Sequence, residues 1–84
     1  MSLMLRIGSN GNDVRKLQTV LNYLHSATPP LRADGIFGPK TYGAVVHFQK
    51  AVKLSADGIV GPITAKALMG VVHGMLTTGK TFFG

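Results

Sequence analysis

The sequence predicts an all-α fold: a small three-helix bundle with an internal pseudo-two-fold repeat. The stretch 33–45 recurs at 56–68, where eight of thirteen positions are identical at an offset of 23 residues. Each copy joins an Asp-Gly turn to the start of a helix, a unit too small to bury its own apolar face. Apolar residues at helical spacing, separated by turn-forming clusters, indicate three helices. The two copies are therefore expected to pack into one core.

The first helix is expected at about residues 12–24. A Gly-Ser-Asn-Gly cluster precedes it, and Asp13 falls in its first turn, where a carboxylate complements the helix dipole. Polar side chains separate its apolar residues. The apolar positions are Val14, Leu17, Leu21 and Leu24, and the polar ones between them include Arg15, Lys16, Gln18 and Asn22.

The second and third helices are expected to begin at Pro39 and Pro62. Proline suits the first helical position, where its missing N–H would have had no partner. We expect the second helix to span residues 39–52 and the third to end near residues 70–74. The residues expected to face the core are Thr41, Ala44, Val45, Phe48, Ala51 and Val52 in the second helix and Thr64, Ala67, Leu68 and Val71 in the third.

The connections carry a second set of signals. Asp34-Gly35 and Asp57-Gly58 are tight-turn pairs, because glycine accepts a positive φ and aspartate bonds nearby backbone groups. Neighbouring side chains in an extended segment point oppositely, so if Phe37 and Val60 enter the core, Ile36 and Ile59 are expected to face outward. The connection 25–38 exceeds the usual loop length, which indicates a functional or locally structured segment.

Composition limits the classes of function. The chain has 84 residues, a net charge of +6 and no cysteine, so hydrophobic packing without disulfides must support one small domain. The charge favours a polyanionic partner such as nucleic acid, an anionic membrane or an acidic wall polymer. The nine Lys and Arg residues are scattered, which weakens the nucleic-acid interpretation. No apolar segment is long enough to span a bilayer.

The domain organisation follows from the extent of these patterns. Residues 1–4 are interpreted as expression-derived or disordered sequence, and residues 5–74 as the domain. Residues 75–84 lie outside the repeat and contain adjacent phenylalanines, Phe82 and Phe83. We expect this segment to be a tail that docks on the bundle or the start of a linker to a further module.

The residue set offers little for catalysis. The only carboxylates are Asp13, Asp34 and Asp57, and the last two occupy the same turn position, where aspartate is expected for backbone reasons. The three histidines, His25, His47 and His73, lack the spacing of a zinc site, and no Ser-His-Asp pattern or phosphate loop is present. We therefore expect no catalytic residue, no bound metal and no cofactor.

The motifs resemble those of the peptidoglycan-binding-like domain, the three-helix module attached to bacterial and phage cell-wall hydrolases. The resemblance covers about residues 5–70. It rests on two Asp-Gly-Ile-(Phe or Val)-Gly-Pro-x-Thr units and on the residues that precede them: Leu5, Arg6, Gly8, Ser9, Gly11, Asp13, Val14, Leu17, Gln18, Leu21 and Asn22. It implies a non-catalytic module that binds peptidoglycan and anchors a lysozyme, amidase or peptidase domain lying outside this chain. The related metalloprotease prodomain uses a cysteine, which is absent here.

The resemblance leaves the contacts with the wall to be argued from the residues. Few aromatic residues and no tryptophan are present, so recognition is expected to depend on polar groups and charge more than on sugar stacking. Our hypothesis is a shallow groove formed by the long loop and the first motif. Its residues are Arg32, Asp34, Gly35, Ile36, Lys40, Thr41 and Tyr42.

Two alternatives from other classes stay open at this point: a basic three-helix domain that binds nucleic acid, and a protein-interaction module. The expected partner is peptidoglycan, through its glycan strand or stem peptide, with no nucleic acid or membrane and with a monomeric chain. The expected location is the cell wall or periplasm, reached by export or by phage lysis, although no signal peptide is visible.

Overall fold

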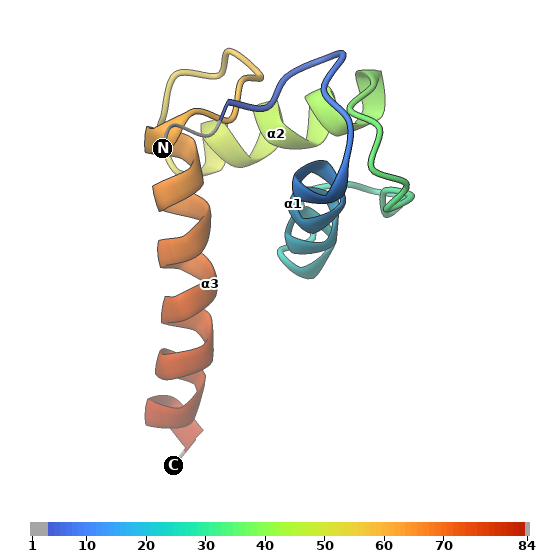
Figure 1. Ribbon diagram of the computed structural model, residues 1–84. Helices are drawn as coiled ribbons and strands as arrows, with labels where there is room; N and C mark the ends of the chain where they lie inside the picture. Colours follow the sequence, from blue (N-terminus) through green and yellow to red (C-terminus); the bar gives the residue numbers. More distant parts are fainter. Residues whose placement is uncertain (1–3, 84) are drawn as a thin grey trace.

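The computed structural model describes the backbone of residues 4–83 and the side chains of residues 4–72. Its three helices are α1 (Asn12–Tyr23), α2 (Pro39–Ala51) and α3 (Pro62–Phe83). α2 lies across one end of the molecule, and α1 and α3 extend from it to the same side (Figure 1). Over the described residues, β-type pairing is limited to two isolated bridges. The predicted all-α, three-helix fold is confirmed, whereas a pseudo-two-fold relation between its halves stays a prediction.

The ends of the helices follow from local chemistry. α2 and α3 begin at their prolines, as predicted. α1 and α2 end in the same way: a residue with positive φ, His25 or Lys53, turns the chain. The next N–H then donates back to the last helical turn, from Ser26 to Leu21 at 2.9 Å and from Leu54 to Gln49 at 2.8 Å. This Schellman arrangement satisfies carbonyls that the helix end leaves without partners.

The predicted end of the third helix near residues 70–74 is wrong, because α3 continues to Phe83. Glycines 70, 74 and 79 each weaken a helix by roughly 1 kcal/mol relative to alanine, but glycine alone does not stop one. No proline follows Pro62 to break the helix. The expectations for residues 1–3 and for docking of Phe82 and Phe83 lie outside the described residues and side chains.

The core lies where the three helices and the two turns meet. Its buried apolar residues are Leu5, Val14, Leu17, Leu21, Leu31, Phe37, Ala44, Val45, Phe48, Val60 and Leu68. Phe37 and Val60 point inward and Ile36 is 62% exposed, as the alternation predicted, while Ile59 is half-buried. Two predictions are wrong: Ala51 is exposed, and Gln18 is buried although it was assigned to the polar side of its helix.

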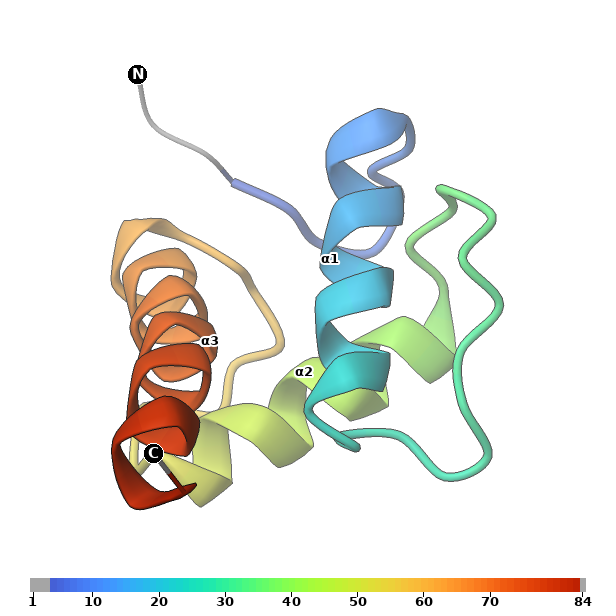
Figure 2. The same cartoon turned by 90° about the horizontal axis from the view of Figure 1, so that it is seen from below.

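The N-terminal segment 5–11, which contains a turn at Ile7 and Gly8, contacts both turns of the repeat. Leu5 pairs with Val60 in the second turn through N–H to O bonds of 3.0 and 2.8 Å. Further along, Ser9 accepts a bond from Phe37 at 2.9 Å, and Gly11 donates to Gly35 at 2.9 Å in the first turn. The first turn precedes the start of α2, whereas the second turn folds back beside α2 between Tyr42 and Gln49. The long loop after α1 lies on the side away from α3 (Figure 2).

Candidate functional site

A buried glutamine organises the first turn. Gln18 is 1% exposed, and its side-chain nitrogen lies 3.2 Å from Asp34 Oδ1, 3.0 Å from the Ile36 carbonyl and 3.1 Å from Thr41 Oγ1. Its side-chain oxygen accepts the N–H of Gly35 at 2.9 Å. A buried amide is stable only when both its donor and acceptor groups find partners. Gln18 therefore joins α1, the turn and the start of α2.

The second turn contains the same hydrogen-bonded arrangement around Gln49. This glutamine is also 1% exposed, and its nitrogen lies 3.0 Å from Asp57 Oδ1, 3.1 Å from the Ile59 carbonyl and 3.1 Å from Thr64 Oγ1. Its oxygen accepts the N–H of Gly58 at 2.9 Å. The two turns thus share a Gln-Asp-Gly-Thr frame, each copy fixing the start of the following helix.

Both aspartates are held as carboxylates. The N–H of Ile36 donates to Asp34 at 2.9 Å, and this bond, together with the Gln18 amide and nearby Arg32, lowers the Asp34 pKa below its usual 3.8. The N–H of Ile59 and the Gln49 amide lower the pKa of Asp57 in the same way. Hydrogen bonds that favour the charged form explain both directions. Because these hydrogen bonds favour the ionised form, neither aspartate is a good donor of a proton near neutral pH.

The first-turn groove, as we call it, is a hollow of about 350 Å³ between the long loop and the start of α2. It brings together five of the seven predicted site residues: Arg32, Asp34, Ile36, Lys40 and Thr41. Both cations are exposed, whereas Thr41 is buried beneath them. The two positive side chains therefore border a groove that contains a single carboxylate among its lining residues.

The other two predicted residues lie elsewhere. Gly35 is buried, and a side chain there would lie 3.0 Å from the Gly11 carbonyl oxygen, so it cannot present a contact to a ligand. The Tyr42 ring lies over Gly58 of the second turn, where it occupies the space that a Cβ would need. Helical periodicity explains the error for Tyr42, because the residue after Thr41 is turned by about 100° around the axis.

The long loop adds a second hollow beside the first-turn groove. Asn22 holds the loop to α1: its amide donates to the Leu31 carbonyl at 2.8 Å, and its oxygen accepts the Leu31 N–H at 2.7 Å. The loop and α2 then enclose about 540 Å³ that Arg32 and Lys40 also line, together with His47. The two cations thus stand between two adjoining hollows, so a ligand longer than one groove can contact both.

Sequence reasoning missed the two glutamines. Each follows a buried residue of its helix, Leu17 or Phe48, and precedes another apolar position three residues later. That placement puts both glutamines on the inward side of their helices, and this spacing was the sequence signal that could have predicted their burial. Their separations from the aspartates differ, 16 residues for the first pair and 8 for the second, so the 23-residue offset did not align them.

Within the described part of the chain, no three His, Cys, Asp or Glu side chains gather as a metal site would require. Nor does any helix there have the length and apolar character needed to cross a membrane. The groove is an exposed, cation-lined surface on a rigid frame. Such a surface suits recognition of an anionic group by charge-assisted hydrogen bonds.

Comparison with known proteins identifies the family. Residues 10–68 match the family model described as "Putative peptidoglycan binding domain". The SleB N-terminal domain superposes with a TM-score of 0.77 at 35% identity, covering 82% of this chain and 92% of that one. A peptidoglycan-binding protein from Clostridioides difficile gives a TM-score of 0.73 at 44% identity, covering 79% and 40% of the two chains.

Two curated relatives are enzymes of much greater length. A "Probable N-acetylmuramoyl-L-alanine amidase" from Bacillus licheniformis is 40% identical over 80 residues, which is 95% of this chain and 23% of the amidase. The "Zinc D-Ala-D-Ala carboxypeptidase" of Streptomyces albus G is 47% identical over 57 residues, covering 68% and 22% of the two chains. The chain spans less than a quarter of either relative. It belongs to the peptidoglycan-binding domain family, as the sequence motifs predicted.

Proposed function

We propose that this chain anchors a cell-wall hydrolase by binding the carboxylates of the peptidoglycan stem peptide in the first-turn groove. The family membership indicates peptidoglycan as the polymer that is bound, and the chemistry of peptidoglycan limits which of its groups the groove can contact. Peptidoglycan carries N-acetylated sugars and short peptides that end in carboxylates. Of these groups, only the carboxylates complement a groove bordered by Arg32 and Lys40.

The cation pair is the observation that carries this proposal. Arg32 presents a planar fork of donors that matches a carboxylate in a bidentate geometry, and Lys40 adds a second positive charge at the same rim. Beneath them, Gln18 and Asn22 lock the turn and the loop, so the groove is formed before a ligand arrives. Preorganisation of this kind reduces the entropy lost on binding.

The glycan ring faces are a weaker candidate for this groove. Sugar rings bind proteins largely by stacking on aromatic side chains, and none of the groove residues is aromatic. The exposed tyrosines are Tyr23, near the end of α1, and Tyr42, which lies against the second turn. Charge rather than stacking therefore favours the stem peptide as the partner here.

Two observations support an anchoring role: the names of the related proteins and the small share of their length that this chain covers. The named relatives are an amidase, a carboxypeptidase and spore cortex-lytic enzymes, and this chain corresponds to a minor part of each. A module with a preformed groove raises the local concentration of an attached catalytic domain on its substrate. The same argument supports the cell wall as the location of this chain.

Co-sedimentation with washed sacculi tests the proposal. The double variant Arg32→Gln/Lys40→Gln should bind at least about tenfold more weakly, because two charge-assisted contacts are lost. Its unfolding free energy should change by less than about 0.5 kcal/mol, as is typical of exposed sites.

The matched control removes two charges elsewhere. Lys50→Gln/Lys66→Gln alters exposed residues of α2 and α3 and should retain binding within about twofold. Equal loss in both variants would indicate attraction by net charge alone and would overturn the groove assignment. Binding to double-stranded DNA, with a steep salt dependence, would favour the nucleic-acid alternative.

A further inference from the structure

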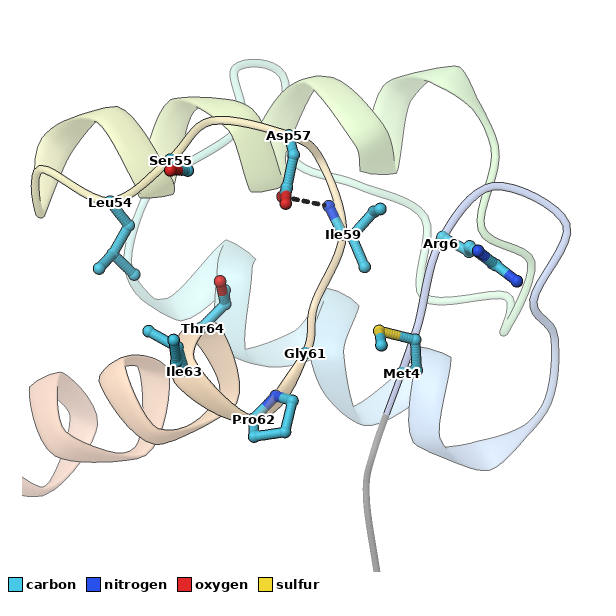
Figure 3. Close-up of a pocket in the computed structure, with 10 residues that line it drawn as sticks. All are labelled: Met4, Arg6, Leu54, Ser55, Asp57, Ile59, Gly61, Pro62, Ile63 and Thr64. Carbon is cyan, nitrogen blue, oxygen red and sulfur yellow. Dashed lines mark hydrogen bonds between the residues drawn. The ribbon is translucent and has the colours of Figure 1, made fainter.

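A second groove, of about 450 Å³, lies at the second turn, between the loop before it and the start of α3 (Figure 3). We call it the second-turn groove. Eight of the nine residues lining the first-turn groove have their counterpart here at the 23-residue offset. The shared Gln-Asp-Gly-Thr frame thus creates a hollow at equivalent positions of both copies, and neither the family match nor the relatives assign a role to the second.

The two grooves differ in charge. Six of the eight pairs keep the residue type: Leu31 and Leu54, Asp34 and Asp57, Ile36 and Ile59, Gly38 and Gly61, Pro39 and Pro62, Thr41 and Thr64. The two pairs that change are the two cations, since Ser55 replaces Arg32 and Ile63 replaces Lys40. The second-turn groove therefore lacks the two cations of the first, and Arg6 is the one positively charged residue that lines it.

Apolar groups take the place of the cations. Ile63 is 73% exposed and Met4, from the N-terminal segment, is 53% exposed, and both line the groove with Leu54 and Pro62. Figure 3 shows Arg6 at the edge, its guanidinium directed away from Met4 and Ile59. Asp57, kept ionised by its hydrogen bonds, repels an anion. This surface favours an uncharged ligand with a small apolar group and a hydrogen-bond donor.

From this contrast, and resting on the proposed function, we infer that the second-turn groove is a separate subsite for an N-acetylated sugar of the glycan strand. An acetamido group is uncharged and combines a methyl group with an N–H donor. The methyl group fits the surface of Leu54, Pro62 and Ile63. The N–H has an acceptor in Asp57: both bonds that hold this carboxylate use Oδ1, which leaves Oδ2 for the ligand.

The N-terminal segment sets how far apart the two subsites lie. Leu5 pairs with the second turn and Asn10 with the first, and a stretch of this length spans at most about 17 Å even when fully extended. These two pairings therefore hold the two turns close together. A carboxylate subsite and an acetamido subsite together would read the stem peptide and the glycan of one polymer.

Titration of the ¹⁵N-labelled chain with N-acetylglucosamine tests the inference, with glucose, which lacks the acetamido group, as the matched ligand. N-acetylglucosamine should shift amide signals of residues 54–64, with a Kd on the order of 10 mM, and leave residues 31–41 unchanged. Glucose should shift neither set. Signals of residues 31–41 responding instead, or an equal response to glucose, would overturn the assignment.

Two matched variants exchange the residues that differ between the grooves, so that each groove receives the rim residues of the other. Ser55→Arg/Ile63→Lys should weaken N-acetylglucosamine binding at the second turn by at least about fivefold. Arg32→Ser/Lys40→Ile should create a response at residues 31–41. All four positions are exposed, so the variants should keep the wild-type spectrum elsewhere. Unchanged responses in both variants would show that these residues do not determine the ligand.

Sacculus binding separates this inference from the proposed function. If the wild-type chain binds sacculi but N-acetylglucosamine causes no shift at residues 54–64, the sugar subsite is wrong and the anchoring role stands. If the chain fails to bind sacculi at all, the anchoring role is wrong whatever the sugar titration gives.

Discussion

The first and second turns have the same internal frame but different surfaces. In both, a glutamine with 1% exposure bonds an aspartate, a glycine N–H and a threonine, with corresponding distances that agree within 0.2 Å. At the rim, Arg32 and Lys40 of the first turn correspond to Ser55 and Ile63 of the second. Buried hydrogen bonds restrict which residues fit, whereas exposed rim positions can change at little cost in stability. One scaffold can thus present two binding chemistries.

The turns also differ in how the chain reaches them. Asp34 follows its glutamine by 16 residues and Asp57 by 8, so the first connection is longer. The additional chain folds against α1 through the paired Asn22 and Leu31 bonds and creates the hollow beside Lys40. The second connection returns directly from α2 to the turn. Added loop length therefore enlarges the hollowed surface at the first turn without changing its hydrogen-bonded frame.

The largest expected effect comes from removing either glutamine. Gln18→Leu and Gln49→Leu should each lower the unfolding free energy by about 3 kcal/mol, because a buried glycine N–H and an aspartate lose their partner. Urea unfolding measures the change, and Lys50→Leu at the neighbouring exposed position is the control. A loss confined to one glutamine would show that the two frames are not equivalent.

Removal of the Tyr42 side chain should change the cost of substituting the glycine in one turn but not in the other. Gly35→Ala and Gly58→Ala should each cost about 2 kcal/mol, because φ is +79° and +74° at these positions. The added methyl at residue 58 meets the Tyr42 ring, whereas at residue 35 it meets the Gly11 backbone.

Tyr42→Ala should therefore reduce the cost of Gly58→Ala to about 1 kcal/mol and leave that of Gly35→Ala unchanged. Thermal unfolding of the three single variants and of the two double variants that combine Tyr42→Ala with each glycine substitution measures both coupling energies. Equal coupling at the two glycines would contradict the placement of the tyrosine over the second turn.

The smallest expected effect concerns pH. The folded-state pKa of Asp34 and of Asp57 lies below 3.8, the unfolded value, so both contribute stability that is complete above pH 3.8. This contribution is lost as the pH falls through the lower folded-state values. In urea unfolding between pH 2 and 5, Asp34→Asn/Asp57→Asn should reduce the fall in unfolding free energy that accompanies a decrease in pH. An unchanged fall would show that other groups cause the acid destabilisation.

Much of the fold was predictable from local signals. The Asp-Gly pairs and the two prolines located both turns and the starts of α2 and α3, because each depends on the backbone preferences of single residues. With Phe37 in the core, alternation correctly predicted that Ile36 is exposed. The end of α3 was not predictable, since glycine is compatible with both a helix and its termination.

The candidate site was only partly predictable. Charge and loop length located Arg32 and Lys40 on one surface, but Gln18 appeared to belong to a solvated helix face until its partners were known. Those partners lie 16 to 23 residues away in sequence, so only the folded arrangement brings them together. The second-turn groove has no pair of cations to indicate it, and it depends on Met4, which was assigned to an expression-derived or disordered start.

The most direct test of the account is to locate a stem-peptide fragment on the two turns. D-Alanyl-D-alanine, titrated into the ¹⁵N-labelled chain, should shift the amide signals of residues 31–41, and Arg32→Gln/Lys40→Gln should abolish the shifts. Residues 54–64 should not respond, because Ser55 and Ile63 occupy the positions that Arg32 and Lys40 have in the first-turn groove. Shifts at residues 54–64, or shifts at residues 31–41 that persist in the double variant, would contradict the account.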